Sequence, residues 1–238
     1  MPEDTLLQRR HRVLGSASPL FYDKPLHLVR GEGVWLFDVD GRRYLDVYNN
    51  VPSVGHANPR VAAAIAQQAA VLNTHTRYLH EGIVRYAEQL LETLPPELGH
   101  VMFTCTGSEA GDLALRKLLP PYIKHGLVLD HTGGTGVIVT RNAYHGVTTE
   151  IAAISPSLVG LEGLAPWVRW VDAPDAFRVD WAGAGFSSLG EWFAAQVQDA
   201  IDDLSRNGIR FAALVLDSVF ASDGAFADPC GFLAPVRD

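Results

Sequence analysis

The chain has 238 residues, 47% of them hydrophobic, which is enough for one large α/β domain or a domain and a half. Its net charge of −8, together with the lack of an apolar run of membrane-spanning length, argues against nucleic acid or a membrane as the main partner. Two cysteines, Cys105 and Cys230, are too few for a disulfide framework and favour a reducing compartment, which we take to be the cytoplasm.

The first third of the chain predicts a polar arm followed by a β-hairpin. The arm contains a short predicted helix over residues 5–14. Asp40 and Gly41 lie between two apolar-aromatic runs, 34–39 and 42–47, and this pattern predicts a two-residue hairpin turn with positive φ at both positions. A loop over 49–56 follows.

The rest of the chain alternates helices with short apolar strands. Apolar stripes, caps and proline stops predict helices over 58–72 and 82–94, from Ser108 to a point before Pro120, and over 189–204. Apolar runs predict strands over 101–104, 137–140, 151–154, 168–171 and 211–216. This alternation implies an α/β fold with a mainly parallel sheet.

Residues 103–115 place a Gly-Ser turn between a β-rich run and an amphipathic helix. Unpaired N–H groups and the positive end of the helix dipole favour an anion there. Gly107 allows close approach of the backbone, and Ser108 adds a hydroxyl donor, so the pattern predicts a phosphate site. The same residues also form an ordinary helix start, with Ser108 as N-cap and Glu109 and Asp112 in the first turn.

Loops at the carboxyl ends of parallel strands are where open α/β sheets bind ligands, and polar groups gather in such loops here. A phosphate cradle at Ser108, a stacking ring from Tyr144 and the carboxylate of Asp217 together suit a planar phosphorylated cofactor. Each residue also has a plainer interpretation: Tyr144 at the rim of the core, His145 as a hydrogen-bonding loop residue, and Asp217 as a strand-end cap. Taken together, they favour a site.

Two other cofactor classes are not favoured. The glycine cluster at 133–136 precedes its strand, whereas a dinucleotide fingerprint places glycines between a strand and a helix, so NAD is not predicted. The nine histidines form no His-x-x-x-His pair and the cysteines no Cys-x-x-Cys pair, so no metal site is predicted.

These motifs resemble the class III (ω-type) pyridoxal-phosphate-dependent aminotransferases of fold type I. The Gly-Ser-Glu-Ala run at residues 107–110, followed by Tyr-His-Gly at 144–146, is the most specific part of the resemblance. The run at 72–80 is similar to the ethanolamine-phosphate phospho-lyase branch of the family. The resemblance covers most of residues 20–238, and its main segments are 33–46, 49–59, 103–115, 142–146 and 217–232.

The resemblance implies pyridoxal 5′-phosphate as the cofactor. It implies that Gly107 and Ser108 hold the phosphate, that Tyr144 stacks on the pyridine ring, that His145 lies beside it and that Asp217 lies near it. Asn50 and Val51 match the segment that lines the substrate side. The implied domains are an N-terminal arm with a hairpin of the small domain (1–56) and a truncated cofactor-binding α/β domain (57–238).

The chain also departs from the family pattern. The lysine that forms the Schiff base and the aspartate that pairs with the pyridinium nitrogen normally lie beyond the point matched by Asp238, and Lys24, Lys117 and Lys124 match no family lysine. Gly111 stands where the family usually has Asn. The connection over 117–130 is longer than in the family.

The expected function is amino-group transfer from an amine donor to a keto acid, with this chain alone inactive. Alternatives are elimination of phosphate from a phospho-amine, a non-catalytic pseudoenzyme or subunit, and an unrelated phosphate-binding α/β domain. The resemblance implies a homodimer with small-molecule amine and keto acid substrates for the intact protein. The composition leads us to expect the cytoplasm and no nucleic acid or membrane partner. A sheet cut before its remaining strands is expected to expose an apolar edge that favours aggregation.

Overall fold

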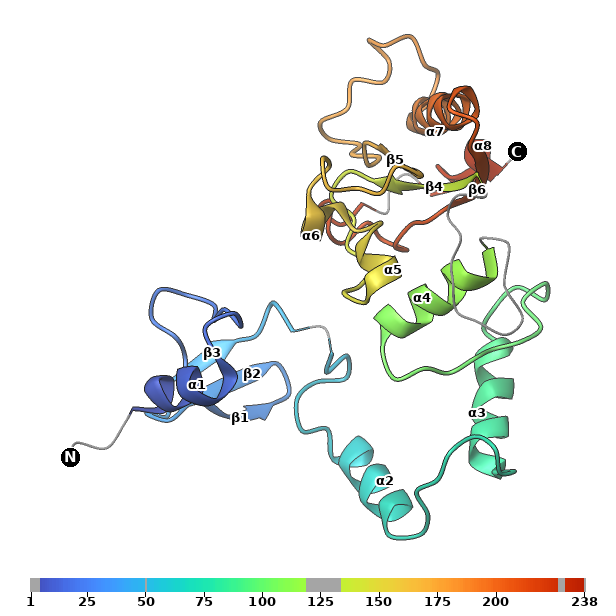
Figure 1. The fold of residues 1–238 in the computed structure, drawn as a ribbon. Coiled ribbons are helices and arrows are strands. Elements are labelled where there is room, and N and C mark those ends of the chain that lie inside the picture. Colours follow the sequence, from blue (N-terminus) through green and yellow to red (C-terminus); the bar gives the residue numbers. More distant parts are fainter. Residues whose placement is uncertain (1–4, 50, 119–133, 227–229, 238) are drawn as a thin grey trace. The chain divides into compact units, whose positions relative to one another are not determined.

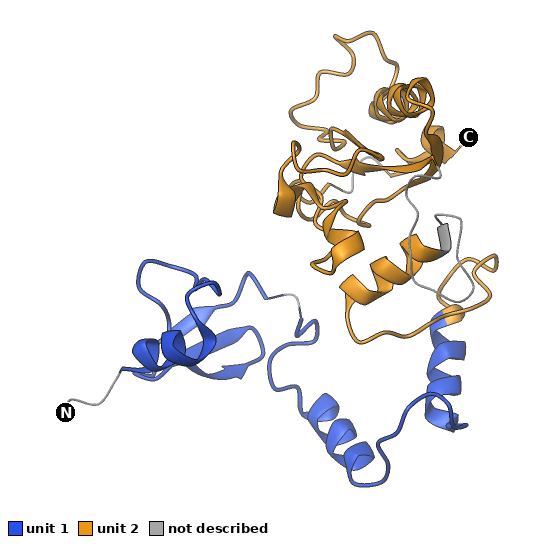
Figure 2. Cartoon of the chain, in the orientation of Figure 1, with its two compact units in different colours: residues 1–90 blue, residues 91–238 orange. Residues whose placement is uncertain are grey.

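The computed structural model describes residues 5–49, 51–118, 134–226 and 230–237. The chain forms two compact units, Met1–Leu90 and Leu91–Asp238 (Figure 2). The boundary expected between residues 56 and 57 concerns the domains of the intact family fold and stays a prediction. Among the described residues, no helix combines the length and hydrophobicity needed to cross a bilayer.

Along the chain, the first unit consists of a helix, a small antiparallel sheet and then further helices. Thr5 caps the first helix through reciprocal hydrogen bonds with Gln8, and Asn58 caps the second by accepting from the backbone of Arg60 and Val61. The predicted helices are therefore confirmed. The elements are α1 (Leu6–Leu14), β1 (Leu28–Glu32), β2 (Trp35–Asp38), β3 (Arg43–Leu45), α2 (Pro59–Ala69) and α3 (Glu81–Leu91), with strand order β1-β2-β3 (Figure 1).

The β2–β3 hairpin lies where Asp40 and Gly41 predict it, but its turn differs from the expected one. Only Gly41 has positive φ (+80°), and the Gly41 N–H donates to the Asp38 carbonyl at 3.0 Å. The Asp38 N–H donates to the Arg42 carbonyl at 3.1 Å, which leaves a three-residue connection. The Asp38 carboxylate accepts from the Arg42 N–H at 2.8 Å and from the Tyr44 hydroxyl at 2.7 Å, so a buried side chain selects the longer turn.

The second unit is a three-layer α/β arrangement. All of its strands are parallel, in the order β5-β4-β6, and every residue of the central strand is buried. The predicted parallel sheet is thus confirmed. The elements are α4 (Gly107–Leu118), β4 (Thr135–Thr140), α5 (Thr149–Ala152), α6 (Pro156–Val159), β5 (Val168–Val171), α7 (Leu189–Arg206), β6 (Arg210–Leu214) and α8 (Ala234–Arg237).

The two faces of this sheet form separate apolar clusters because successive strand residues point to opposite faces. Val137 and Val139 of β4 pack on one face with Leu115 of α4 and Ile151 of α5. Ile138 packs on the other face, where the apolar stripe of α7 covers it. Figure 1 shows α7 and α5 on opposite sides of the β5-β4-β6 sheet.

Two strand predictions are wrong. Residues 101–104 form no strand, and Met102 and Phe103 are exposed, because an extended segment becomes a strand only beside a hydrogen-bonding neighbour. Residues 151–154 lie in α5 and the turn after it. Ile151 and Ile154 are both buried, and a spacing of three places them on one face of a helical turn.

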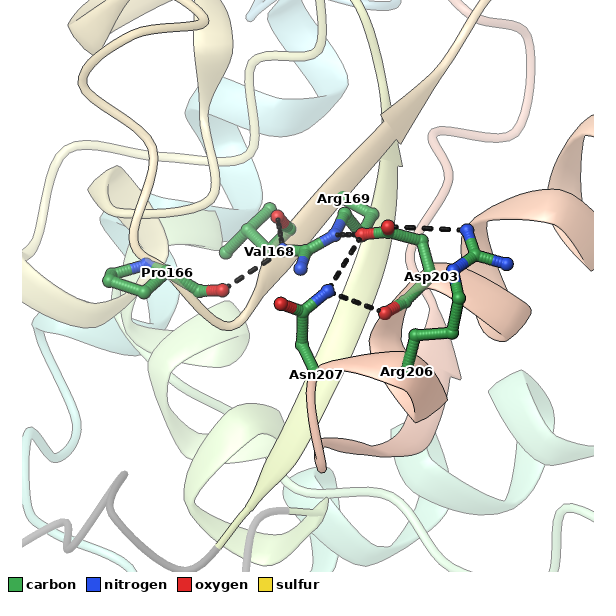
Figure 3. A network of polar contacts seen from close by, with 6 residues as sticks. All are labelled: Pro166, Val168, Arg169, Asp203, Arg206 and Asn207. Atoms are coloured by element: carbon green, nitrogen blue, oxygen red, sulfur yellow. Dashed lines mark hydrogen bonds and ion pairs between the residues drawn. The ribbon is translucent and has the colours of Figure 1, made fainter.

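The edge of the sheet where β5 begins is closed by a polar network (Figure 3). Arg169 donates to the carbonyls of Pro166 and Val168 at 2.9 Å and pairs with Asp203 of α7. The hydrogen bond from Arg169 lowers the pKa of the Asp203 carboxyl. Asn207 donates to the Asp203 carbonyl at 2.8 Å. These contacts fasten the last turn of α7 to β5 and leave the opposite, carboxyl edge for a ligand.

Candidate functional site

Helix α4 begins with a capping box that leaves the Ser108 hydroxyl free of a capping role. The Thr106 hydroxyl accepts from the Glu109 N–H at 3.1 Å, and the Glu109 carboxylate accepts from the Thr106 N–H at 2.9 Å. The alternative interpretation of Ser108 as N-cap is therefore wrong, because Thr106, two residues earlier, caps the helix by accepting from the Glu109 N–H. Gly107, the first residue of the helix, has open space around the position of a Cβ.

Ser108 joins α4 to the loop that follows β4. Its hydroxyl oxygen accepts from the Val147 N–H at 3.0 Å, and its carbonyl accepts from the Thr148 hydroxyl at 3.2 Å. Gly146 has a φ of +144°, and a Cβ there would lie 2.6 Å from Ser108 Oγ. Glycine is thus required at this approach, which brings the predicted phosphate residue and the predicted ring loop together.

His145 lies in the same loop, and its Nε2 atom is buried without a hydrogen-bond partner among the described residues. Its backbone N–H donates to the buried Ser155 hydroxyl at 3.0 Å, which fixes the loop. Burial lowers the pKa of His145, and the charges of Asp217 and Asp223 oppose this shift. The result is a partly dehydrated imidazole on which the charges of two carboxylates act.

Asp217 follows β6 and accepts from the N–H groups of Val219 at 2.8 Å and Ala221 at 2.6 Å. Its plainer interpretation, as a cap at the end of a strand, describes these contacts correctly. Its charge also reaches His145. Ser108 is thus joined to the loop that carries His145, and Asp217 lies close enough for its charge to act on that ring.

The remaining predicted residues are less constrained. Tyr144 lies on the loop after β4 with 48% of its surface exposed. Val51 belongs to the first unit and is 90% exposed, and Asn50 lies outside the described residues. The connection over 117–130 falls almost entirely outside them as well.

Three further residues, which are not predicted from the sequence as site residues, hold the site together. The buried Ser155 hydroxyl accepts from His145 and donates to the Ile151 carbonyl at 2.7 Å. Asp112, expected only as a first-turn acid, accepts from the Ile151 N–H at 2.9 Å. Asp223 binds Thr140 and Asn142 across more than eighty positions of sequence. Only the position of Asp112 near the start of α4 could have drawn attention to any of them.

The site residues fit a phosphorylated aromatic group. Because Ser108 Oγ accepts from Val147, its own proton remains available for an anion at the start of α4. The unpartnered His145 Nε2 is a polar atom that a ligand can satisfy. Tyr144 supplies an exposed ring on the same loop.

Comparison with known families decides among the fold-level interpretations. A family model described as aminotransferase class-III matches residues 21–238. The chain belongs to the class III aminotransferase family. This membership confirms the resemblance and the fold class, because the solved relatives share the architecture of the pyridoxal-phosphate-dependent transferases of fold type I.

Individual members of the family differ in what they are named for. A solved phospholyase from Arthrobacter, in complex with phosphoethanolamine, is 43% identical with a TM-score of 0.82, over 98% of this chain and 52% of that one. An alanine–glyoxylate aminotransferase 2-like protein of Drosophila melanogaster is 32% identical over 98% of this chain and 46% of its own length. An amine transaminase from an uncultivated Pseudomonas species, solved in its PLP-bound form, is 26% identical with a TM-score of 0.70, over 94% of this chain and 51% of its own. The class III chain described here thus spans about half the length of these relatives.

Proposed function

We propose that the carboxyl edge of the β5-β4-β6 sheet binds pyridoxal 5′-phosphate. Gly107 and Ser108 would hold the phosphate, Tyr144 would stack on the ring, and His145 and Asp217 would lie beside it. The observation that carries this proposal is the 3.0 Å hydrogen bond from the Val147 N–H to Ser108 Oγ, which joins the anion-binding turn to the ring-bearing loop.

The bound cofactor supplies an electron sink for bond cleavage next to an amino group. The residues of this chain position it. Ser108 directs a hydroxyl proton and the start of α4 toward the phosphate. Burial lowers the pKa of His145 and so favours the neutral ring. A neutral imidazole can form a hydrogen bond with the cofactor without bringing a positive charge into the site. Asp217 places a carboxylate at the end of the adjacent strand.

For the intact protein, we propose elimination of phosphate from a small phospho-amine. The support is the higher identity to the Arthrobacter phospholyase (43%) than to the Drosophila aminotransferase-like protein (32%). Amino-group transfer from an amine to a keto acid is the second candidate. The similarity to the Drosophila aminotransferase-like protein supports it. The remaining family-level proposals are a cytoplasmic homodimer and a substrate side at Asn50 and Val51.

Residues 1–238 alone are proposed not to carry out either reaction. The chain has three lysines, Lys24, Lys117 and Lys124, and none matches the family position that forms the covalent bond to the cofactor. A protein completed by a lysine-bearing partner, or a binding protein without catalysis, remains the alternative from another functional class.

Titration with pyridoxal phosphate, in which binding is monitored by the quenching of tryptophan fluorescence, tests the proposed site. The variant Ser108→Ala should weaken binding about tenfold or more, because a hydrogen bond to a charged group contributes about 1.5–3 kcal/mol. Tyr144→Ala should weaken it about fivefold, because a ring contact contributes about 1 kcal/mol. Ser205→Ala, which truncates an exposed serine of α7, is the matched control and should bind normally.

Unchanged affinity in both site variants would contradict the proposed cofactor site. Borohydride reduction of the same mixture tests the lysine proposal separately. We expect no stoichiometric pyridoxyl-lysine in the mass spectrum, whereas a stoichiometric adduct on Lys117 would overturn it.

A further inference from the structure

Asp223 connects the ends of two neighbouring strands at the candidate site. Its Oδ2 accepts from the hydroxyl of Thr140, the last residue of β4, at 2.5 Å. Its Oδ1 accepts from the backbone N–H of Asn142 at 2.9 Å. One carboxylate thus binds the chain on both sides of Arg141, where it leaves the sheet and enters the loop that carries Tyr144 and His145.

The turn that carries Asp223 is anchored in the core of the second unit. Phe220 is 2% exposed, and its ring meets Phe193 of α7 edge-on, with centroids 6.1 Å apart. The Phe220 carbonyl accepts from the N–H groups of Asp223 at 3.0 Å and Gly224 at 3.1 Å. This packing holds the Asp223 carboxylate at a fixed place, so it is a rigid attachment point for the loop after β4.

The same turn links the two carboxylates near His145. The Asp217 side chain accepts from Ala221, two residues before Asp223. The charges of Asp217 and Asp223 both oppose the effect of burial on the His145 ring. Asp223 therefore has two separable effects: its hydrogen bonds restrain the loop, and its charge acts on His145.

We propose that Asp223 is a positioning residue that holds the Tyr144 loop in the geometry needed to stack on the cofactor ring. This inference rests on the proposed function of the site. Without the carboxylate, the buried Thr140 hydroxyl and the Asn142 N–H lose their acceptor at the point where the loop leaves the sheet. Tyr144 follows two residues later and is exposed, so no buried ring contact would compensate.

Comparison of Asp223→Ala with Asp223→Asn separates the hydrogen bonds from the charge. The amide of Asn can still accept from Asn142 and can donate to the Thr140 hydroxyl, whereas Ala can do neither. In the cofactor-free chain, hydrogen exchange of the Asn142 amide should be about tenfold faster in the Ala variant and near the parent value in the Asn variant. The NMR titration of His145 should shift to lower pH in both, because both remove the charge.

Binding of pyridoxal phosphate should weaken about tenfold in Asp223→Ala and be largely restored in Asp223→Asn. Asp199→Ala, which removes an exposed carboxylate of α7, is the control for net charge. It should change neither the exchange rate of the Asn142 amide nor the affinity for pyridoxal phosphate. If Asp223→Ala fails to fold, Thr140→Val removes only one partner and should give a smaller change in the same direction.

The outcomes distinguish this inference from the proposed function. If the parent chain does not bind pyridoxal phosphate, the proposed function fails, and the exchange and titration measurements still decide whether Asp223 holds the loop. If the parent binds and Asp223→Ala binds equally well with unchanged Asn142 exchange, the positioning role is overturned. Weaker binding that Asp223→Asn does not restore would also overturn it, since the charge alone would then be responsible.

Discussion

His145 experiences two opposing influences at the carboxyl edge of the sheet. Burial of the ring disfavours the imidazolium, while the charges of Asp217 and Asp223 favour it, and burial is the larger effect. Such a balance between desolvation and nearby charge is typical of residues in ligand sites, although structural residues show it as well. The consequence for stability can be measured without any ligand.

We expect the free energy of unfolding to fall as the pH drops below about 6.5, the ordinary pKa of histidine. The folded state has the lower pKa, so below this pH the unfolded chain binds more protons than the folded chain. The stabilising effect of the neutral ring is fully present above the unfolded pKa and is lost as the pH falls toward the folded pKa. Urea midpoints measured at pH 7.5 and 5.5 test this.

The variant His145→Gln should reduce this pH dependence, and His11→Gln, at an exposed position of α1, should preserve it. The carboxyl groups with lowered pKa, such as Asp175 and Asp203, do not interfere. Their stabilising effect is fully present above the ordinary pKa of an Asp side chain, 3.8, and is lost as the pH falls through their lowered pKa values. An identical pH dependence in His145→Gln would show that the ring does not titrate as described.

At the scale of elements, the close packing of α4 on α5 explains why glycine suits position 111. The resemblance leads to the expectation of Asn at position 111, where this chain has Gly. A Cβ at this position would lie 2.7 Å from Ile151 Cδ1 and 2.8 Å from Cγ1. Ile151 is 2% exposed and its N–H is held by Asp112, so it has little room to move.

Gly111→Ala should therefore destabilise the protein by about 1 kcal/mol. Alanine gains about 0.5–1 kcal/mol of helix propensity, and overpacking costs about 1–3 kcal/mol. In the double variant with Ile151→Ala, which deletes both Cγ1 and Cδ1, the cost of Gly111→Ala should largely disappear. Denaturant unfolding of the two single variants and the double variant measures this coupling. Strictly additive effects would show that the two side chains do not compete for space.

At the scale of the whole molecule, the two units differ in how much apolar surface each buries. Both core clusters belong to the second unit. Among the described residues up to Leu90, the only buried one is Asp38. In α2, Ile65 is 65% exposed, and in α3, Tyr86 is 55% exposed. Amphipathic helices with uncovered apolar stripes favour association with another surface.

We expect residues 1–238 to self-associate at micromolar concentrations, with a weight-average mass in sedimentation equilibrium that rises with concentration. Ile65→Glu should reduce this association, because it places a charge in the apolar stripe of α2. Gln67→Glu adds the same charge to the same helix at a polar, exposed position and should have little effect. A monodisperse monomer that melts cooperatively would contradict the expectation.

The sequence by itself determined the local elements and the chemical character of the site. Caps and apolar stripes located α1, α2 and α7, and an Asp-Gly pair located the hairpin, because these signals act over a few residues. The motif around Ser108 and the loop around His145 were also recognisable, because both depend on residue types at short spacing.

Only the tertiary structure decided which of several local solutions each segment adopts. Apolar residues at 151 and 154 suit a strand or a helical turn, and packing beneath α4 selects the turn. Thr106 and Ser108 can both cap α4, and the contact with Val147 gives Ser108 another role. Asp223 meets Thr140 across 83 positions of sequence. Such choices depend on burial and on hydrogen bonds between distant segments, which the order of residues along the chain does not reveal.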